Sequence, residues 1–321
     1  MSNNDEQHDE KTPFFSVIIP VHNKADYLEK SLACVHAQIF RNFEVIAVDD
    51  CSTDGSLEIL QRHERAGVLR LYRRDKPGPG GYAARNFGVS KARAEWVIFF
   101  DADDAMRDDH LSVFHSVIAR NGDLEFICNN YVMKVGEKIV GKNSGIQSGR
   151  YRRIDGLSFF AHNDFVHMNS ACMRRGLFDR LGGFPEGRYR RGGDVYFWVK
   201  LLICIEEFYY CEKVTTEWHL DNSFVTKCPD NLTVHPLADF IREEEPRLDP
   251  ACDMQLRRII NRKIIAWATE KKLQGRQCYH DFPHVSLKGL GCENMMRMLA
   301  LALPASIYQV AITMKRAWRA G

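Results

Sequence analysis

The sequence lacks the closely spaced cysteine pairs that are typical of proteins stabilised by disulfide bridges or by zinc. None of its ten cysteines forms a C-x-x-C pair, and they are scattered singly from Cys34 to Cys292. Several of them lie inside apolar runs, where a free thiol behaves as a small hydrophobic side chain. Disulfide bridges and zinc sites are therefore the weaker interpretations, and we expect a reducing, cytoplasmic compartment.

The sequence also lacks an excess of charge of one sign. Its 44 lysines and arginines nearly balance its 42 aspartates and glutamates, which leaves a net charge of +2. Nucleic-acid-binding proteins usually show a strong basic excess, so we expect no nucleic-acid partner. The opening stretch MSNNDEQHDEKTP is mainly polar, so we expect it to be neither a signal peptide nor a membrane anchor. We expect residues 1–13 to form a disordered tail.

What the sequence does contain is a regular alternation of apolar runs with amphipathic segments. Apolar strands followed by helices of this kind are typical of an α/β protein with a mainly parallel central sheet and flanking helices. Beyond residue 140 the alternation weakens into mixed loops around one strong helix, and the last quarter of the chain is helical in character. The predicted strands are 14–21, 43–50, 68–74, 96–100 and 124–133, and the predicted helices include 24–38, 52–66, 109–120 and 194–207.

Polar side chains follow three of the predicted strands. Strand 14–21 leads into His22 and Asn23, strand 43–50 ends in Asp49 and Asp50, and strand 96–100 runs into Asp101, Asp103 and Asp104. Parallel α/β sheets bind ligands outside the carboxyl ends of their strands, so these groups are expected to share one site.

The last of these clusters needs a compensating cation, because neighbouring carboxylates repel one another. Carboxylates one residue apart can share Mg²⁺ or Mn²⁺, which also bridges phosphate oxygens. Alternatively, Asp101 and Asp104 cap the following helix. From these residues alone both interpretations stay open.

Four segments in order carry a family resemblance. They are FSVIIPVHNKADYLEKSL, FEVIAVDDCSTDGSLEIL, GYAARNFGVSKARAEWVIFFDADD and LFDRLGGFPEGRYRRGGDVYFWVKL. Together they resemble a family-2 glycosyltransferase with the nucleotide-sugar-binding fold called GT-A, over residues 14 to about 225. The resemblance implies inverting, metal-dependent transfer of a sugar from a nucleoside diphosphate donor, with Mn²⁺ or Mg²⁺ as cofactor. The pattern along the chain predicts a catalytic domain over 14–234 and a helical C-terminal region over 235–321. The catalytic domain is expected to consist of a nucleotide-binding half (14–104) and an acceptor-side half (105–234).

The resemblance assigns donor-binding roles residue by residue. Residues Pro20 to Asn23, with His22 between them, are expected to form one wall of the nucleotide pocket. Asp50 is expected to accept hydrogen bonds from the base, taken to be uracil, because an ionised carboxylate only accepts. Asp49 beside it either shares that role or holds the loop together, and the second role is the favoured one.

The resemblance predicts that the ARN and DADD segments bind the ribose and the phosphates of the donor. Arg85 is expected near the base or the phosphates, Asp101 at the ribose and Asp103 on the metal. Asn86 is expected to order its loop. Asp104 is given a supporting or capping role.

The general base is expected at Asp194. Family members typically carry Glu-Asp just before an amphipathic helix, and here Gly193 stands in the place of the glutamate. A carboxylate at this position can remove the proton of the acceptor hydroxyl as that hydroxyl attacks the anomeric carbon. The alternative is that Asp194 is an N-cap of the helix that contains VYFWVKLL, a role that is compatible with catalysis.

Two weaker candidates complete the site. His219 lies where some relatives place a histidine beside the metal or the diphosphate, although a lone histidine is more often structural. Arg188, Arg190 and Arg191 either clamp an anion or form a solvated basic loop. Since no Q-x-x-R-W motif and no bundle of long apolar segments is present, we expect one sugar to be added per encounter.

Two other functions remain as alternatives. A nucleotidyltransferase also has acidic strand ends and a metal, but it usually carries a glycine-rich, lysine-bearing loop after its first strand, and PVHNKADY has no glycine. A catalytically degenerate nucleotide-sugar-binding protein is supported only by Gly193. A phosphatase motif D-x-D-x-[TV] is disfavoured because Ala105 stands at its last position.

The C-terminal segment 293–319 suggests a membrane contact. It is mainly apolar from Met295 to Met314 and ends in basic and aromatic residues, but Pro304 interrupts it. An interfacial helix fits this pattern, which would hold the enzyme at the inner face of the cell membrane beside a lipid-linked acceptor. Packing on the catalytic domain or on another subunit is the alternative, so an oligomer stays open.

Overall fold

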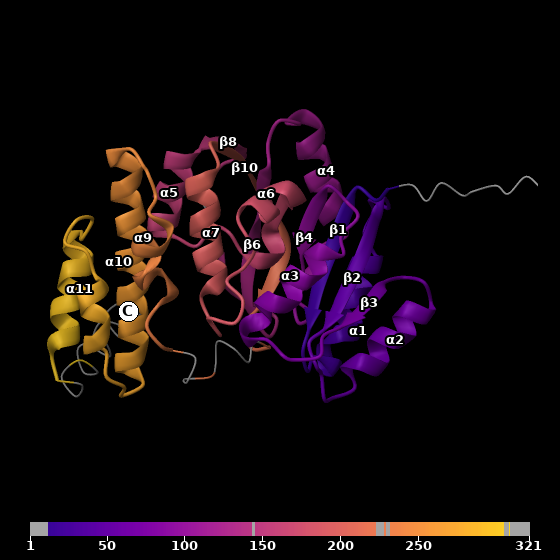
Figure 1. Cartoon of the computed structure of the whole chain (residues 1–321), viewed down its shortest axis with the longest axis horizontal. Helices are drawn as coiled ribbons and strands as arrows, with labels where there is room; N and C mark the ends of the chain where they lie inside the picture. The colour runs from indigo at the N-terminus through magenta and orange to yellow at the C-terminus, as the bar shows by residue number, and fades with distance from the viewer. Residues whose placement is uncertain (1–11, 143–144, 223–227, 229–231, 305–307, 309–321) are drawn as a thin grey trace, which may run out of the picture.

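The computed structural model describes residues 12–142, 145–222, 228, 232–304 and 308. In this part of the chain one ten-stranded sheet forms the centre, and helices cover both of its faces (Figure 1). The strand order is β3-β2-β1-β4-β9-β6-β10-β5, with β7 paired to β6 and β8 to β10. The strands are β1 (Phe15–Val21), β2 (Phe43–Asp49), β3 (Arg70–Arg73), β4 (Trp96–Phe99), β5 (Ala105–Met106), β6 (Phe126–Val135), β7 (Lys138–Lys142), β8 (Gly149–Arg152), β9 (Ala171–Arg174) and β10 (Glu207–His219).

The long strands of the sheet run in one direction. β1 pairs in parallel with β2 and β4, and β2 pairs in parallel with β3. β9 is antiparallel to both β4 and β6, and β6 is parallel to β10, so β6 and β10 share the direction of β1. The expected mainly parallel sheet is thus confirmed. The carboxyl ends of β1, β2, β4 and β10 lie at one edge, which we call the carboxyl edge.

Helices form a layer on each face because successive residues of a strand point to opposite sides. Val17 and Ile19 of β1 join a core with α1, α2 and α4, whereas Ile18 joins a second core with α3, α5, α6 and α7. The helices are α1 (Ala25–His36), α2 (Ser56–Arg65), α3 (Tyr82–Ser90), α4 (His110–Arg120), α5 (Arg153–His162), α6 (Arg175–Arg180), α7 (Gly193–Cys204), α9 (Phe240–Glu244), α10 (Pro250–Leu273) and α11 (Cys292–Ala302). Short 3-10 turns are η1 (Pro79–Gly81), η2 (Met168–Ser170), η4 (Pro236–Ala238) and η5 (Tyr279–His284).

One glycine lets α3 lie close to the sheet. A Cβ at Gly88 would come within 2.4 Å of Cγ2 of Ile18 and 3.3 Å of Cγ2 of Val48. Only a residue without a side chain permits this approach to β1 and β2. The close packing brings the first turn of α3 to the carboxyl edge, where Arg85 lies.

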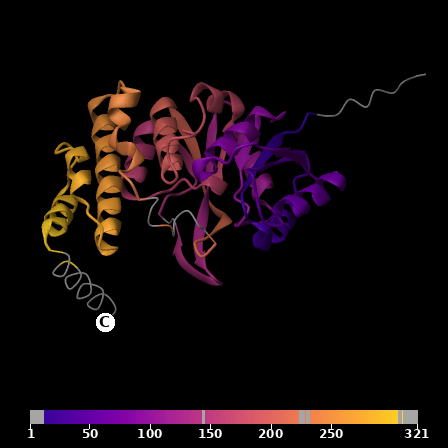
Figure 2. The same ribbon diagram turned by 60° about the horizontal axis from the view of Figure 1, so that its bottom comes forward.

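The expected helical C-terminal region is confirmed as far as Ala302. Its helices stack at the end of the molecule opposite α1 and α2 (Figures 1 and 2). Leu256, Ile259 and Ile264 of α10 are buried in the same core as α5 and α7, so this region packs on the rest of the protein. In the part of the chain that the structure describes, no helix is both long and apolar enough to cross a membrane. Most of 305–321 lies outside the described residues, and the domain boundaries stay predictions.

Three strands lie where the sequence predicted only mixed loops around a helix. β8 and β9 contain four residues each, and β10 contains 13. The register of β10 against β6 shifts between Cys211 and Val214 and again before Thr216. Each shift interrupts the period-two alternation by which a strand is recognised in a sequence, which explains why β10 was missed.

Candidate active site

The loops after β1 and β2 are tied to the glycine-rich loop before α3. The Asp50 carboxylate accepts a hydrogen bond from the Gly78 N–H at 3.1 Å and forms an ion pair with Arg74. Nδ1 of His22 lies 2.8 Å from the Asp50 carbonyl oxygen. The residues predicted to line the nucleotide pocket therefore lie together, with Pro20 at the end of β1 beside them.

Asn23 and Asp49 hold the turn that follows β2. Asn23 adopts a φ of 53°, a left-handed conformation that asparagine tolerates better than most residues. Its Oδ1 accepts from the Thr53 N–H at 2.8 Å, while Oδ1 of Asp49 accepts from the Ser52 N–H at 3.2 Å. The loop-holding interpretation of Asp49 agrees with this contact.

Arg85 and Asp101 form a partly buried ion pair on the carboxyl edge. Nη2 of Arg85 lies 2.5 Å from Oδ1 of Asp101, and Nη1 donates to the Gly80 carbonyl oxygen at 3.1 Å. Burial alone would raise the pKa of Asp101, but the Arg85 guanidinium and other neighbouring groups hold it below its ordinary value. The carboxylate is therefore ionised and can accept hydrogen bonds.

Asp103 pairs with a lysine that the sequence analysis did not single out. Nζ of Lys24 lies 2.5 Å from Oδ2 of Asp103 and 3.3 Å from the Asn222 carbonyl oxygen. Burial raises the pKa of Asp103, the Lys24 ammonium opposes this rise and the Asp101 carboxylate adds to it. Lys24 and Arg85 thus supply part of the positive charge that the acidic cluster requires. The only signal for Lys24 in the sequence is its place directly after the strand-end residues.

Asp104 links this cluster to the end of β10. Its Oδ1 accepts from the His219 N–H at 2.8 Å, and its Oδ2 accepts from Nδ2 of Asn169 at 2.6 Å. Burial, together with the nearby Asp103 and Asp101 carboxylates, raises its pKa well above the ordinary value. The capping alternative for this cluster is wrong, because the N-cap of α4 is Asp109.

A divalent cation at this site would need ligands in addition to the described side chains. Within the described ranges no three His, Cys, Asp or Glu side chains converge to hold an ion by themselves. Burial and the neighbouring Asp101 carboxylate both raise the pKa of Asp103, and an added cation would stabilise the ionised form of Asp103 there. The His219 side chain lies beside Glu217, with 3.6 Å between Nε2 and Oε2. Asp104 contacts the backbone N–H of His219, not its ring. The metal-binding role of His219 stays a prediction.

Asp194 lies in the first turn of α7. Its Oδ1 is 3.4 Å from the Tyr82 hydroxyl of α3, and the N-cap of the helix is Gly192. The N-cap interpretation of Asp194 is therefore wrong. Tyr82 belongs to α3, the helix that also carries Arg85, so this contact links Asp194 to the donor-side helix.

The segment leading to Asp194 is anchored by the asparagine of the ARN motif. Oδ1 of Asn86 accepts from the Phe184 N–H, and its Nδ2 donates to the Phe184 carbonyl oxygen, both at 2.9 Å. A further bond of 3.0 Å joins Nδ2 to Glu186. The loop that Asn86 orders is thus the one over 183–186, on the acceptor side.

Two of the three arginines before α7 bind the C-terminal helices. Arg188 pairs with Glu243 of α9 at 2.5 Å, and Arg191 pairs with Glu270 of α10 at 2.9 Å. These contacts dock the loop before Asp194 onto the C-terminal helices and use both guanidinium groups. Two of the three arginines proposed to clamp an anion are therefore already paired with glutamates.

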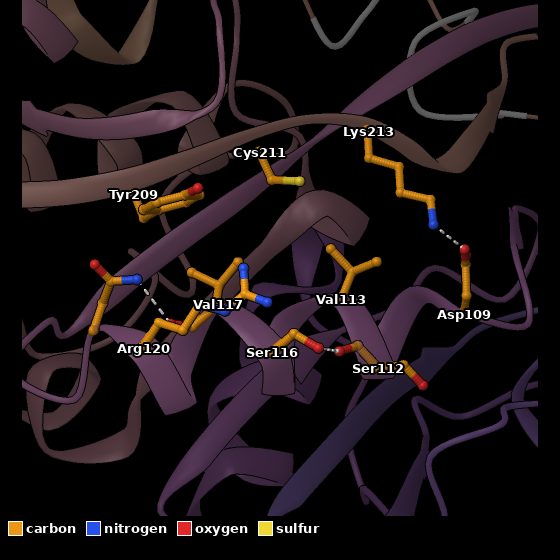
Figure 3. Close-up of a pocket in the computed structure, with 10 residues that line it drawn as sticks. Asp109, Ser112, Val113, Ser116, Val117, Arg120, Tyr209, Cys211 and Lys213 are labelled. Atoms are coloured by element: carbon orange, nitrogen blue, oxygen red, sulfur yellow. Dashed lines mark hydrogen bonds and ion pairs between the residues drawn. The ribbon is translucent and has the colours of Figure 1, made fainter.

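A separate groove of about 370 Å³ lies between α4 and β10 (Figure 3). None of the predicted site residues lines it. Some of its polar groups are engaged with one another, since Lys213 pairs with Asp109 and the Ser116 hydroxyl donates to the Ser112 carbonyl oxygen (Figure 3). We assign it no chemistry.

Comparison with known sequences shows where the chain belongs. The model of the family described as "Glycosyl transferase family 2" matches residues 16–182, more than half of the chain. A glycosyltransferase of Haemophilus influenzae is 36% identical over 201 residues, which cover 61% of this chain and 73% of that protein. The teichuronic acid biosynthesis glycosyltransferase TuaG of Bacillus subtilis is 39% identical over 103 residues, 31% of this chain and 39% of that protein. Another relative, from Rickettsia felis, is matched over 30% of its own length.

Solved structures agree on the fold. The crystal structure of Staphylococcus aureus TarS 1–349 in complex with UDP-GlcNAc superposes with a TM-score of 0.67 at 21% identity, covering 84% of this chain and 78% of that one. The mannosyltransferase PcManGT of Pyrobaculum calidifontis, in complex with GDP-Man and Mn²⁺, superposes with a TM-score of 0.56 at 19% identity, covering 97% and 88%. The chain belongs to glycosyl transferase family 2, and its fold is that of the GT-A glycosyltransferases.

Proposed function

We propose that the protein transfers a sugar from a UDP-linked donor to a hydroxyl group of a glycan or lipid-linked acceptor, one sugar per encounter and with inversion. The observation that carries this proposal is the set of acidic and basic side chains at the carboxyl edge. There the Arg85–Asp101 and Lys24–Asp103 pairs follow the ends of β4 and β1. Tyr82 ties Asp194 to α3, the helix that also carries Arg85. The structural relative that holds UDP-GlcNAc supports a nucleotide-sugar donor.

The nucleoside is proposed to bind between the ends of β1 and β2. Pro20, His22 and Asn23 form one wall, and Asp50 accepts from the base. Oδ1 of the Asp50 carboxylate already accepts from Arg74, and Oδ2 accepts from the Gly78 N–H. A carboxylate oxygen has two lone pairs, so acceptor capacity for a uracil N–H remains.

The ribose and diphosphate are proposed to lie along the end of β4. Asp101 accepts from the ribose hydroxyls, and Arg85 behind it adds positive charge toward the base or the phosphates. Asp103, with His219 as a second candidate, would hold Mn²⁺ or Mg²⁺ together with the diphosphate oxygens. When bound, such a cation acts as a Lewis acid that stabilises the leaving diphosphate.

Asp194 is proposed to be the general base of a single displacement. Its carboxylate takes the proton of the acceptor hydroxyl while the hydroxyl oxygen forms a bond to the anomeric carbon. The bond between that carbon and the diphosphate oxygen breaks, and UDP leaves with the electron pair. Because attack comes from the face opposite the leaving group, the product has the inverted anomeric configuration.

A panel of nucleotide sugars tests the proposed function against its alternatives. We expect UDP to be released from one donor in the presence of Mn²⁺, with water or an added acceptor receiving the sugar. A nucleotidyltransferase would instead form or consume pyrophosphate, and a degenerate binding protein would bind a donor without turnover. Either of those two results would contradict the proposal.

The C-terminal segment 293–319 is proposed to contact an anionic membrane surface. On α11, Met296 and Leu299 are 63% and 62% exposed, while Leu301 packs into a small core with Ile265. From Asn294 to the end of the chain the sequence contains basic residues and no acidic one. Apolar side chains beside basic residues favour anionic headgroups.

Replacing the two exposed residues of α11 is expected to weaken this contact without unfolding the protein. The Met296→Gln/Leu299→Gln variant should sediment with anionic liposomes less than the native protein, because it loses apolar area that would enter the interface. Truncation after residue 290 should release the protein more completely, although it also removes Leu301 from its core. The matched control is Ile139→Gln/Val140→Gln on β7, whose side chains are 60% and 55% exposed. Equal loss in both variants, or no sedimentation of the native protein, would contradict the contact.

A further inference from the structure

Gly193 lies where the family resemblance leads one to expect a glutamate, and the structure shows what fills that space. A Cβ at Gly193 would lie 2.8 Å from Cε2 and 2.9 Å from Cζ of Tyr82, and 3.2 Å from Cγ of Pro185. Packed interiors do not absorb overlaps of this size without a shift of the neighbour. No side chain at residue 193 therefore fits unless the Tyr82 ring moves.

The Tyr82 ring is held from several sides. Tyr82 is the first residue of α3 and is 4% exposed. Its ring stacks on Phe184 with a centroid distance of 5.9 Å, and a Cβ at Gly80 would come within 2.4 Å of it. Two glycines and a phenylalanine thus leave room for one position of this ring.

The Tyr82 hydroxyl contacts two consecutive residues at the start of α7. It accepts a hydrogen bond from the Gly193 N–H at 2.9 Å and lies 3.4 Å from Oδ1 of Asp194, to which it donates. The first N–H groups of a helix have no partner inside the helix, so the hydroxyl satisfies one of them. Burial, with the Asp194 carboxylate beside it, raises the pKa of Tyr82, so the hydroxyl stays protonated and remains a donor.

We propose that Tyr82 is the positioning residue of Asp194, which it ties to the helix that carries Arg85. This inference rests on the proposed function, in which Asp194 is the general base. Tyr82 and Arg85 lie one turn apart on α3, so one helix sets the acceptor side and the donor side of the site together. In this protein a ring from α3 occupies the place of the glutamate, and the glycine before Asp194 makes room for it.

The Tyr82→Phe variant tests this role because it keeps the ring and removes both hydrogen bonds. We expect the kcat of UDP release, with the donor that the panel identifies, to fall about ten- to a hundredfold, the usual effect of losing a hydrogen bond to a charged group. The KM for the donor and the affinity for UDP should not change. The matched control is Tyr196→Phe in α7, which loses bonds to Glu243 and Glu244 and should keep full turnover.

Two further variants separate positioning from a general loss of structure. Gly193→Ala keeps the hydroxyl but displaces the ring, and it should lose turnover while UDP binding stays unchanged. Tyr82→Phe added to Asp194→Asn should cause no further loss, since the residue that Tyr82 positions has already been disabled.

Each outcome of these experiments has a definite meaning. Full turnover in Tyr82→Phe, or UDP affinity that falls in step with kcat, overturns the positioning role. Full turnover in Asp194→Asn overturns the proposed function instead, so the two failures are distinguishable. A double variant that loses the product of both single effects would show that Tyr82 acts independently of Asp194, which also overturns the inference.

Discussion

The Asp194→Asn variant is expected to bind the nucleotide donor as the native protein does and to release UDP on the order of 10²-fold more slowly or worse. The substitution keeps the size of the side chain and its place beside the Tyr82 hydroxyl, but the amide cannot take the proton of the attacking hydroxyl. Binding of UDP should be unaffected, because the donor-side groups are held by their own contacts, such as the Arg85–Asp101 pair. The measurements are steady-state UDP release and calorimetric titration with UDP.

A matched variant shows whether the loss reflects chemistry or helix stability. Asp253 lies in the first turn of α10, as Asp194 lies in the first turn of α7. An acidic residue there interacts favourably with the helix dipole, worth about 0.3–1 kcal/mol. Asp253 also pairs with Arg257 and Lys288, so Asp253→Asn costs at least as much stability as Asp194→Asn. Asp253→Asn should therefore keep its turnover. Unaltered UDP release in Asp194→Asn, or donor binding that falls together with it, would remove Asp194 from the catalytic role.

The Asp103→Asn variant is expected to lose metal-dependent turnover, by on the order of 10²-fold, while the protein stays folded. A Lewis acid at the leaving diphosphate contributes several kcal/mol, and the amide removes the charge that would hold it. Mn²⁺ should no longer strengthen UDP binding in this variant, whereas UDP affinity without metal should change little. Titrations with UDP in the presence and absence of Mn²⁺ measure both effects.

The ion pair with Lys24 demands a control, since Asp103→Asn also breaks that pair. Asp109→Asn breaks a more exposed aspartate–lysine pair, with Lys213 at the groove beside α4, and it should leave turnover unchanged. Lys24→Gln separates the two roles of Asp103, because it removes the pair and keeps the carboxylate. If Asp103→Asn retains most of its activity, or if Mn²⁺ strengthens UDP binding in it as in the native protein, Asp103 is only the partner of Lys24.

The nucleotide-binding half could be predicted from the sequence because its signals are local. The strands Phe15–Val21, Phe43–Asp49 and Trp96–Phe99 are mainly apolar and are separated by helices, and parallel pairing puts their polar ends on one edge. The second half depends on pairings that no local pattern reveals. Ala171–Arg174 is a strand because it fills the space between β4 and β6, and Glu207–His219 is interrupted by shifts of register.

The same difference between local signals and long-range pairings applies to the contacts within the site. Strand ends and the ARN motif could be located from the sequence, but their partners come from other elements. Lys24 reaches Asp103 from the loop after β1, and Tyr82 reaches Asp194 from α3, across 112 residues of chain. Such pairs depend on how helices and loops pack, and only the folded structure shows them.

The anomeric configuration of the released sugar tests the central claim of a single displacement most directly. The donor that turns over in the panel is mixed with the native protein and Mn²⁺, and the first product is observed by proton NMR before mutarotation. The coupling constant of the anomeric proton should show the configuration opposite to that of the donor. A first product with the configuration of the donor would contradict attack from the face opposite the leaving diphosphate, and with it the role of Asp194 as the base of that attack.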